Sequence, residues 1–170
     1  MYNLKLAKKE VNLFLIEKNL INFNPINLIE KINLNISEKT SYTTNVKGKM
    51  TDWKFFVKDK EINDIFNQCF DILNWLPIKR SFLESCWGNE LNLNEFVKEH
   101  DHHMASVSGL IYLTENGPGT FFNDFNITVE EKIGKILFFS PLAKHSVLPS
   151  NLNKSRYTIS FNFQALENFN

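Results

Sequence analysis

Three of the four histidines lie within four consecutive positions, with His100, His102 and His103 surrounding Asp101, and the fourth, His145, lies before a later apolar segment. If the first group is extended, residues two apart point to the same face, so His100 and His102 can direct two imidazoles at one point while Asp101 and His103 point away. A third imidazole from His145 could complete a set of three nitrogen ligands that leaves positions open on iron, zinc, copper or nickel. Paired histidines near a loop are also common in solvated turns, so this motif needs support from elsewhere in the chain.

That support comes from residues 156–163, where polar and apolar side chains alternate. The polar face carries Arg156, Thr158, Ser160 and Asn162. In a plain β-sandwich this face would lie in water, but an arginine with a hydroxyl two residues later can also bind a carboxylate, because the guanidinium can donate two parallel hydrogen bonds. Three metal ligands and a carboxylate-binding arginine are together what an enzyme that uses a metal-chelating keto acid requires.

The second half of the chain reads as short extended segments separated by turn residues, with a strong turn at residues 116–119. We expect strands at residues 107–113, 121–125, 135–139, 146–148 and 156–163. Segments this short and this regularly interrupted predict a mainly β fold of the α+β kind, an antiparallel sandwich or barrel with a helix against one face.

Parity along the strand also predicts which side chains share a face with the histidines. If no bulge intervenes, Ser108, Leu110 and Tyr112 lie on the side of His100 and His102. The other face would then carry Val107, Gly109, Ile111 and Leu113.

The first half is less regular. Residues 11–16 and 28–36 are apolar or alternating enough to predict strands, and the polar residues 37–49 predict a loop. Residues 61–76 differ, because their apolar side chains recur at intervals of three and four, the period of an amphipathic helix, which Pro77 would end.

Length and composition predict one domain spanning residues 1–170, with N-terminal strands and a supporting helix in residues 1–80 and the β core with the metal site in residues 82–165. Lys plus Arg equals Asp plus Glu at 19 each, so no strong signal for nucleic-acid binding is present. The cysteines, Cys69 and Cys86, have apolar neighbours and are expected to be buried free thiols in a reducing cytoplasm.

No apolar segment is long enough for a signal-peptide core or a membrane span, so we expect an intracellular protein without a membrane partner. Frequent Asn, Lys, Ile and Phe indicate AT-rich coding, as in many marine bacteria and phages, and a phage protein would act in the host cytoplasm. The sequence leaves the oligomeric state open.

Four blocks of sequence resemble a known family. They are CWGNELN at residues 86–92, HDHHMASVSGLIYL at 100–113, KILFFSPLAKHSVLP at 135–149 and SRYTISFNF at 155–163. In order and spacing they are similar to the Fe(II)- and 2-oxoglutarate-dependent oxygenases, in particular to the small bacterial and phage branch related to prolyl 4-hydroxylases. The resemblance covers roughly the second half of the chain. It implies a double-stranded β-helix, a cupin-like jelly-roll of two antiparallel sheets with helices packed on one of them.

The resemblance also implies the roles of individual residues. His100, His102 and His145 would bind Fe(II), and no catalytic residue is implied beyond these ligands. Arg156 would pair with the far carboxylate of 2-oxoglutarate, helped by Thr158 and Tyr112. The implied reaction uses dioxygen to hydroxylate an unidentified substrate, either a protein side chain or a small molecule.

One departure from the family pattern leaves alternatives open. The wider superfamily commonly has HxD, whereas this chain has His102 at the second position, and a β-bulge could instead bring Asp101 and His103 to the metal. A three-histidine cupin-type dioxygenase without 2-oxoglutarate and a non-catalytic jelly-roll binding or structural module are the other readings. The environment of Arg156 distinguishes these hypotheses. As a keto-acid anchor it should be buried and face the histidines, whereas in a structural module it should be exposed or paired with an acid.

Overall fold

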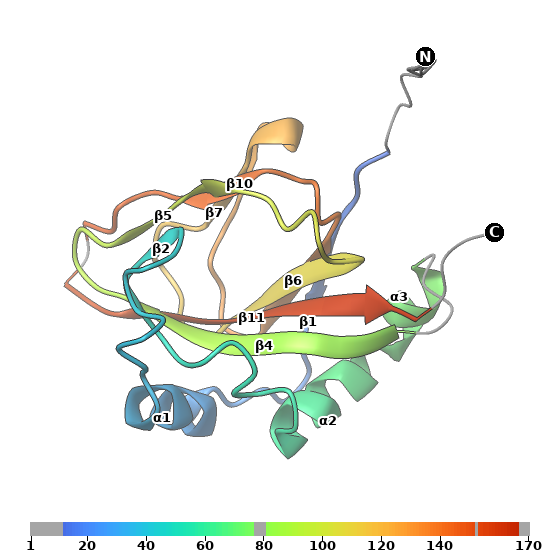
Figure 1. Ribbon diagram of the computed structural model, residues 1–170, viewed down its shortest axis with the longest axis horizontal. Helices are drawn as coiled ribbons and strands as arrows, with labels where there is room; N and C mark the ends of the chain where they lie inside the picture. The colour runs from blue at the N-terminus through green and yellow to red at the C-terminus, as the bar shows by residue number, and fades with distance from the viewer. Residues whose placement is uncertain (1–11, 77–80, 152, 167–170) are drawn as a thin grey trace, which may run out of the picture.

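Two antiparallel sheets face each other in the computed structural model, which describes residues 12–76, 81–151 and 153–166 (Figure 1). The larger sheet has the order β1 (Leu15–Asn19), β9 (Lys135–Phe139), β6 (Val107–Tyr112), β11 (Arg156–Ala165), β4 (Ser81–Leu91), β3 (Lys49–Met50). The smaller sheet has the order β2 (Val46–Lys47), β5 (Phe96–His100), β10 (His145–Val147), β7 (Thr120–Phe122), β8 (Ile127–Val129). The predicted mainly β jelly-roll is therefore confirmed, and the N-terminal strand β1 is part of it.

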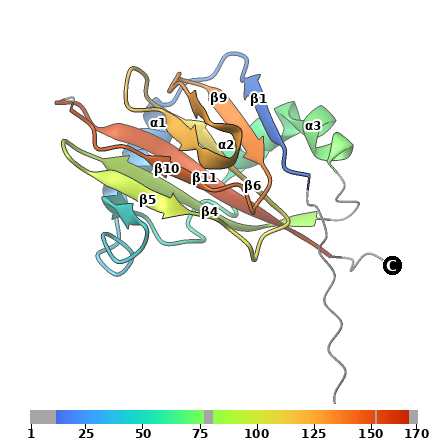
Figure 2. The same ribbon diagram turned by 90° about the horizontal axis from the view of Figure 1, so that it is seen from above.

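Helices cover the face of the larger sheet that points away from the smaller one, as Figures 1 and 2 show for α1 (Ile26–Leu34) and α2 (Lys60–Gln68). A short helix α3 (Phe70–Trp75) follows α2 directly, and a 3-10 turn (Asn123–Phe125) follows β7. Asp59 is the N-cap of helix α2, and its carboxylate accepts the backbone N–H groups of Glu61 and Ile62. The predicted helix at residues 61–76 is thus present but is divided in two at Cys69.

The prediction of a strand at residues 28–36 was wrong, because these residues form most of α1. Apolar and polar residues alternate here, but the spacing also fits a helix. The two buried side chains, Leu28 and Ile32, are four residues apart and face the sheet. The start of the helix is marked by Pro25 at the N-cap position and by Asn24, whose side chain accepts the Ile26 N–H at 3.1 Å. Packing against the larger sheet selects the helix over the strand.

The other segments follow the prediction more closely. The strand expected at residues 11–16 is displaced to β1, and position 11 lies outside the described residues together with Pro77. The predicted loop at 37–49 contains the two-residue strands β2 and β3. The strands near 107–113, 135–139, 146–148 and 156–163 are present, whereas that at 121–125 ends early in the 3-10 turn.

The apolar core lies in two layers that β6 separates. Val107 and Ile111 belong to the layer between the helices and the larger sheet, whereas Leu110 and Tyr112 belong to the layer between the two sheets. The predicted parity is therefore confirmed for these four residues. Between them, Gly109 has no room for a side chain, because a Cβ there would lie 2.2 Å from the Leu137 carbonyl oxygen.

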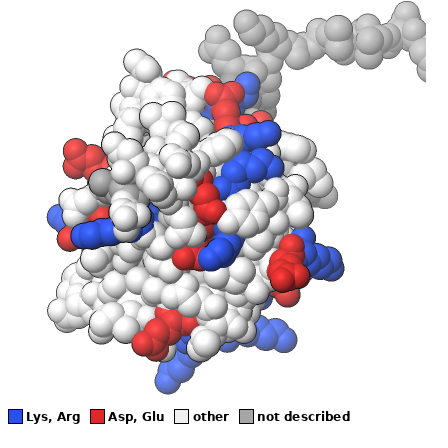
Figure 3. Space-filling view, turned by 90° about the vertical axis from the view of Figure 1, so that its left-hand side faces the viewer, with Lys and Arg blue, Asp and Glu red and all other residues white. Residues whose placement is uncertain are grey.

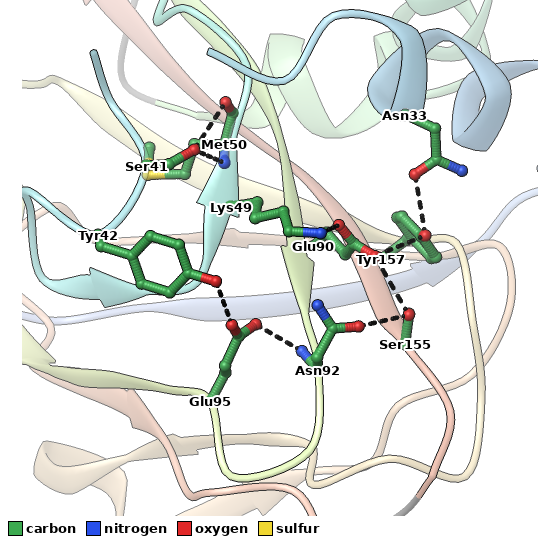
Figure 4. A network of polar contacts seen from close by, with 10 residues as sticks. All are labelled: Asn33, Ser41, Tyr42, Lys49, Met50, Glu90, Asn92, Glu95, Ser155 and Tyr157. Carbon is green, nitrogen blue, oxygen red and sulfur yellow. Dashed lines mark hydrogen bonds and ion pairs between the residues drawn. The ribbon is translucent and has the colours of Figure 1, made fainter. Parts of the chain in front are cut away.

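A polar network connects the C-terminal end of β4 and the N-terminal end of β11 to β3 and the segment before it (Figure 4). At its centre Glu90 is nearly buried and accepts the Tyr157 hydroxyl at 3.0 Å, with Lys49 Nζ at 3.2 Å. Glu95 accepts the Tyr42 hydroxyl and, at 2.7 Å, the Asn92 backbone N–H. Through Glu95, the network links the segment at Tyr42 to the connection between β4 and β5.

The distribution of charge on the surface is consistent with the equal numbers of acidic and basic residues. Acidic and basic side chains are interspersed on the face shown in Figure 3. Within the described residues, no helix has the length and apolar character needed to cross a membrane.

Candidate active site

His100, His102 and His145 meet between the two sheets although 45 residues separate the first from the last. Strand pairing produces the meeting, because β10 runs antiparallel to β5 with His145 directly opposite His100. His102 follows the end of β5, where its backbone N–H donates to the Pro141 carbonyl at 2.7 Å. One ring nitrogen of each histidine lies within 4.8 Å of the other two. The predicted face is thus formed by a strand end and the loop after it, not by one continuous strand.

Local hydrogen bonds fix which nitrogen of two rings is free. His100 Nδ1 lies 2.8 Å from the Lys98 carbonyl oxygen, and His145 Nδ1 lies 3.0 Å from the Ala143 carbonyl oxygen. A carbonyl oxygen only accepts, so Nδ1 carries the hydrogen in both rings and Nε2 keeps its lone pair. This is the usual support for a metal-binding histidine.

Burial keeps all three imidazoles neutral at pH 7. Loss of hydration lowers the pKa of His102 to about 4 and that of His145 to about 3, and repulsion from His100 adds to both shifts. The pKa of His100 is also lowered, again chiefly by burial. Neutral imidazole is the form that binds a metal, so the site is prepared for a cation without the loss of protons.

Asp101 and His103 lie together outside this group. The Asp101 carboxylate accepts from the His103 backbone N–H at 3.3 Å and lies 3.1 Å from His103 Nδ1, an interaction that lowers the pKa of Asp101. The His103 side chain is mostly exposed. Among the described residues, the geometry that could hold a metal joins His145 to His100 and His102, and does not include this pair.

Arg156 and Thr158 line the same cavity as the three histidines. Both lie on one face of β11, and both side chains are buried, with Arg156 only 4% exposed. The Arg156 Nη2 group contacts Thr120 Oγ1 at 3.4 Å, and its guanidinium carbon lies 5.4 Å from the centre of the Tyr112 ring. The Tyr112 hydroxyl donates to Thr120 Oγ1 at 2.8 Å. Tyr112 therefore lies against the arginine and supports it.

An acidic residue that the sequence did not single out also contacts the arginine. Glu131 Oε2 lies 3.5 Å from Arg156 Nε, and the Glu131 side chain is fully buried. Arg156 thus meets both criteria set out above, since it is buried facing the histidines and is also paired with an acid. Glu131 precedes a lysine and follows another glutamate, a pattern typical of a solvated surface, so nothing in its neighbourhood marks it.

Asn89 supports the wall of the cavity from β4. Its side-chain amide donates to Thr158 Oγ1 at 3.2 Å and to Ser160 Oγ at 3.0 Å, and its carbonyl oxygen accepts the Trp87 indole N–H at 3.1 Å. Cross-strand pairing places Asn89 opposite Thr158. In an asparagine-rich chain, such a role becomes visible only once the strands are paired.

No protein-family model matches the chain, and no curated protein sequence is detectably similar to it. Solved structures are similar in fold. Viral collagen prolyl hydroxylase vCPH from Paramecium Bursaria Chlorella virus-1, in its 2OG complex, superposes with a TM-score of 0.69 over 89% of this chain and 96% of that chain, at 15% identity.

Two further solved structures widen the comparison. A Pseudomonas putida prolyl-4-hydroxylase gives a TM-score of 0.62 at 18% identity, covering 88% of this chain and 92% of that one. The non-heme alpha ketoglutarate dependent epimerase SnoN from nogalamycin biosynthesis gives 0.69 at 10% identity, covering 89% and 77%. The chain therefore has the double-stranded β-helix fold of the 2-oxoglutarate- and iron-dependent oxygenases, and the resemblance of its four sequence blocks is confirmed at the level of the fold.

Proposed function

We propose that the protein is a non-haem Fe(II)- and 2-oxoglutarate-dependent dioxygenase that hydroxylates a protein side chain or a small molecule. One observation carries the proposal: a single buried cavity has three neutral imidazoles at one end and a guanidinium at the other. The first end fits a divalent transition metal and the second fits a carboxylate. A keto acid with a second carboxylate can use both ends at once.

In this assignment His100, His102 and His145 hold Fe(II) through their ring nitrogens. Arg156 binds the far carboxylate of 2-oxoglutarate and Thr158 contributes its hydroxyl. When bound, the iron and 2-oxoglutarate supply the oxidising chemistry, with dioxygen consumed and succinate and carbon dioxide released. The protein positions these groups and supplies no further acid or base.

Apolar side chains form part of the cavity wall. Leu110, Phe139 and Val147 line the cavity together with the charged and polar groups, and all three are buried. An apolar wall strengthens the attraction between Arg156 and a bound carboxylate, because it lowers the local dielectric constant. It also protects a reactive metal site from side reactions with solvent.

The substrate is proposed to approach beside His102. A second hollow shares His100, His102, Trp87 and Val46 with the cavity and continues to Trp53, which is 42% exposed. Trp53 packs edge-on against Trp87 at 4.7 Å between ring centres. Aromatic walls of this kind suit an apolar portion of a peptide or small molecule. Two of the structural neighbours are prolyl hydroxylases by name, and a third is an epimerase from nogalamycin biosynthesis.

The cytoplasm is the proposed site of action. Cys69 and Cys86 are both buried free thiols. Burial raises the pKa of Cys69 to about 11, so its reactive thiolate form is scarce. Free cysteines and an Fe(II) enzyme both suit a reducing compartment.

The experiment that tests the proposal measures binding of 2-oxoglutarate to the purified protein, by calorimetry, with and without Ni(II) as a redox-stable substitute for Fe(II). We expect binding that requires the metal. Slow succinate formation with Fe(II) and dioxygen, even without the substrate, would support the same conclusion. Absence of metal binding would overturn the proposal, and so would metal binding that leaves 2-oxoglutarate unbound.

A second candidate function is a three-histidine metal dioxygenase that needs no 2-oxoglutarate. The contact between Glu131 and Arg156 favours it, because a buried acid already compensates the charge of the arginine. The same calorimetry separates the two, since this candidate binds Ni(II) but not the keto acid. A non-catalytic module would bind neither.

A further inference from the structure

The buried carboxylate of Glu131 is only partly hydrogen-bonded. Its Oε1 atom accepts the Thr114 hydroxyl, but Oε2 has no hydrogen-bond partner among the described residues. The Nε atom of Arg156, 3.5 Å away, is also buried without one. An unmade hydrogen bond between buried charged groups costs stability, so a role in ligand binding would explain why two such atoms face each other beside the cavity.

The carboxylate has little freedom to move. Gly117 lies against it so closely that a Cβ at this position would stand 2.0 Å from Glu131 Oε2. Thr114 holds the other oxygen and also receives the Tyr157 backbone N–H on its hydroxyl oxygen at 2.9 Å. The position of Glu131 is therefore set by the loop that follows β6 and by β11 itself.

Glu131 approaches the guanidinium at Nε, where Oε2 lies 3.5 Å away. A guanidinium has five N–H donors in a fixed plane, and Nε carries one of them. Thr120 contacts Nη2, and the Tyr112 ring lies against the guanidinium. These contacts constrain both the orientation of the guanidinium plane and its position beside the cavity. The Nη groups carry the donors that a ligand carboxylate would use.

Charge balance is consistent with a dianion between the two ends. Arg156 and Glu131 carry opposite charges and lie 3.5 Å apart, so the pair adds no net charge to the site. A divalent cation held by the imidazoles then gives the cavity two positive charges, which a dicarboxylate neutralises. A charge left unbalanced in such a site would be costly.

We propose, on the basis of the function proposed above, that Glu131 is a positioning residue. It holds the Arg156 guanidinium at the distance from the histidine-bound metal that a five-carbon 2-oxo dicarboxylate can span. Glu131 thereby makes the site selective for chain length.

The test compares the affinity of the Ni(II)-loaded protein for 2-oxoglutarate with its affinity for 2-oxoadipate, one methylene longer, by calorimetry without turnover. The unaltered protein should prefer 2-oxoglutarate. Glu131→Gln should weaken 2-oxoglutarate binding about tenfold, as expected for the loss of one charge-assisted contact, and should reduce the preference. Glu131→Asp draws the carboxylate back by one methylene, so it should shift the preference toward 2-oxoadipate.

Glu90→Gln is the matched control, because Glu90 is also a nearly buried acid on the β framework but contacts Lys49 and Tyr157 and does not line the cavity. It should lower thermal stability and leave the chain-length preference unchanged. Ni(II) affinity should be the same in every variant, since the histidines are untouched.

The outcomes separate this inference from the function on which it rests. If the unaltered protein binds Ni(II) but no keto acid, the proposed function fails. If it binds 2-oxoglutarate and the Glu131 variants keep its affinity and its preference, only the positioning role fails. Should Glu131→Gln not fold, Thr114→Val removes the hydroxyl that holds Glu131 and should produce the same loss of preference in weaker form; an unchanged preference there overturns the inference.

Discussion

The two ends of the cavity are fixed in different ways. At the histidine end, His100 and His145 each place Nδ1 against the carbonyl two residues earlier, at Lys98 and Ala143. At the arginine end, Arg156 is held by residues 25 to 44 positions away along the chain. The histidine end thus depends on its own short segments and on one strand pairing, whereas the arginine end depends on the assembled fold.

The ends also differ in charge. The histidine end is neutral until a metal binds, so the loss of one imidazole leaves no unpaired charge behind. The arginine end contains a buried ion pair, and removal of one partner leaves the other uncompensated. Substitutions at the first end should therefore affect function without much loss of stability, and substitutions at the second should affect both.

The largest effect is expected for His145→Ala. Loss of one of three ligands should reduce Ni(II) binding and Fe(II)-dependent succinate formation by more than about 100-fold, since even the loss of an outer partner of a ligand costs 10–100-fold. The far-ultraviolet circular dichroism spectrum should remain that of the folded protein. His103→Ala, which alters an exposed ring, is the control. If His103→Ala abolishes metal binding and His145→Ala does not, the ligands are assigned wrongly.

Arg156→Met should impair binding and folding together. We expect the 2-oxoglutarate requirement to rise by about 100-fold, because one end of the dicarboxylate loses a paired charged partner. The free energy of unfolding should fall by about 3–5 kcal/mol, because Glu131 is left buried and unpaired. Urea titration measures the second quantity.

The double variant Arg156→Met with Glu131→Met sharpens this contrast. With both charges gone, most of the lost stability should return while 2-oxoglutarate binding stays weak. If the double variant is as unstable as Arg156→Met, the charge left on Glu131 does not cause the instability.

Asn89→Ala should have an intermediate effect that is mainly structural. It removes the amide that links the Trp87 indole to the hydroxyls of Thr158 and Ser160. The expected cost is about 2 kcal/mol in unfolding free energy, with a change of only a few-fold in 2-oxoglutarate affinity, because Thr158 keeps its place on β11. A loss of affinity as large as that of Arg156→Met would mean that Asn89 itself contacts the ligand.

The same difference between the ends explains what the sequence could predict. A short strand with alternate histidines and an alternating C-terminal strand are local patterns, and they led to the histidines, to Arg156 and to the β sandwich. Glu131, Thr120 and Asn89 come near Arg156 and Thr158 only through pairing and packing of distant segments. No local period in the sequence carries that information.

The misread element in the first half has a related cause. Residues 28–36 satisfy both the period of a strand and the spacing of a short helix, so local pattern alone does not decide between them. The larger sheet decides, because Leu28 and Ile32 are buried in the apolar layer on its outer face, to which Phe56 also belongs. Tertiary packing therefore overrode the alternation, as it commonly does for short amphipathic segments.

The smallest effect should come from Tyr42→Phe, which touches neither end of the cavity. The hydrogen bond to Glu95 is the main reason that the pKa of Tyr42 is raised from 10.0 to about 12. A raised pKa means that the folded state retains the phenolic proton, so this contribution to stability is present below pH 10 and is lost as the pH rises through about 12. Tyr42 is 48% exposed, which limits the contribution.

Tyr42→Phe should lower the melting temperature at pH 7 by about 1–2 °C and leave Ni(II) and 2-oxoglutarate binding unchanged. The difference between the two proteins should shrink as the pH rises from 10 to about 12. A constant difference would show that ring packing, not the hydrogen bond, is responsible.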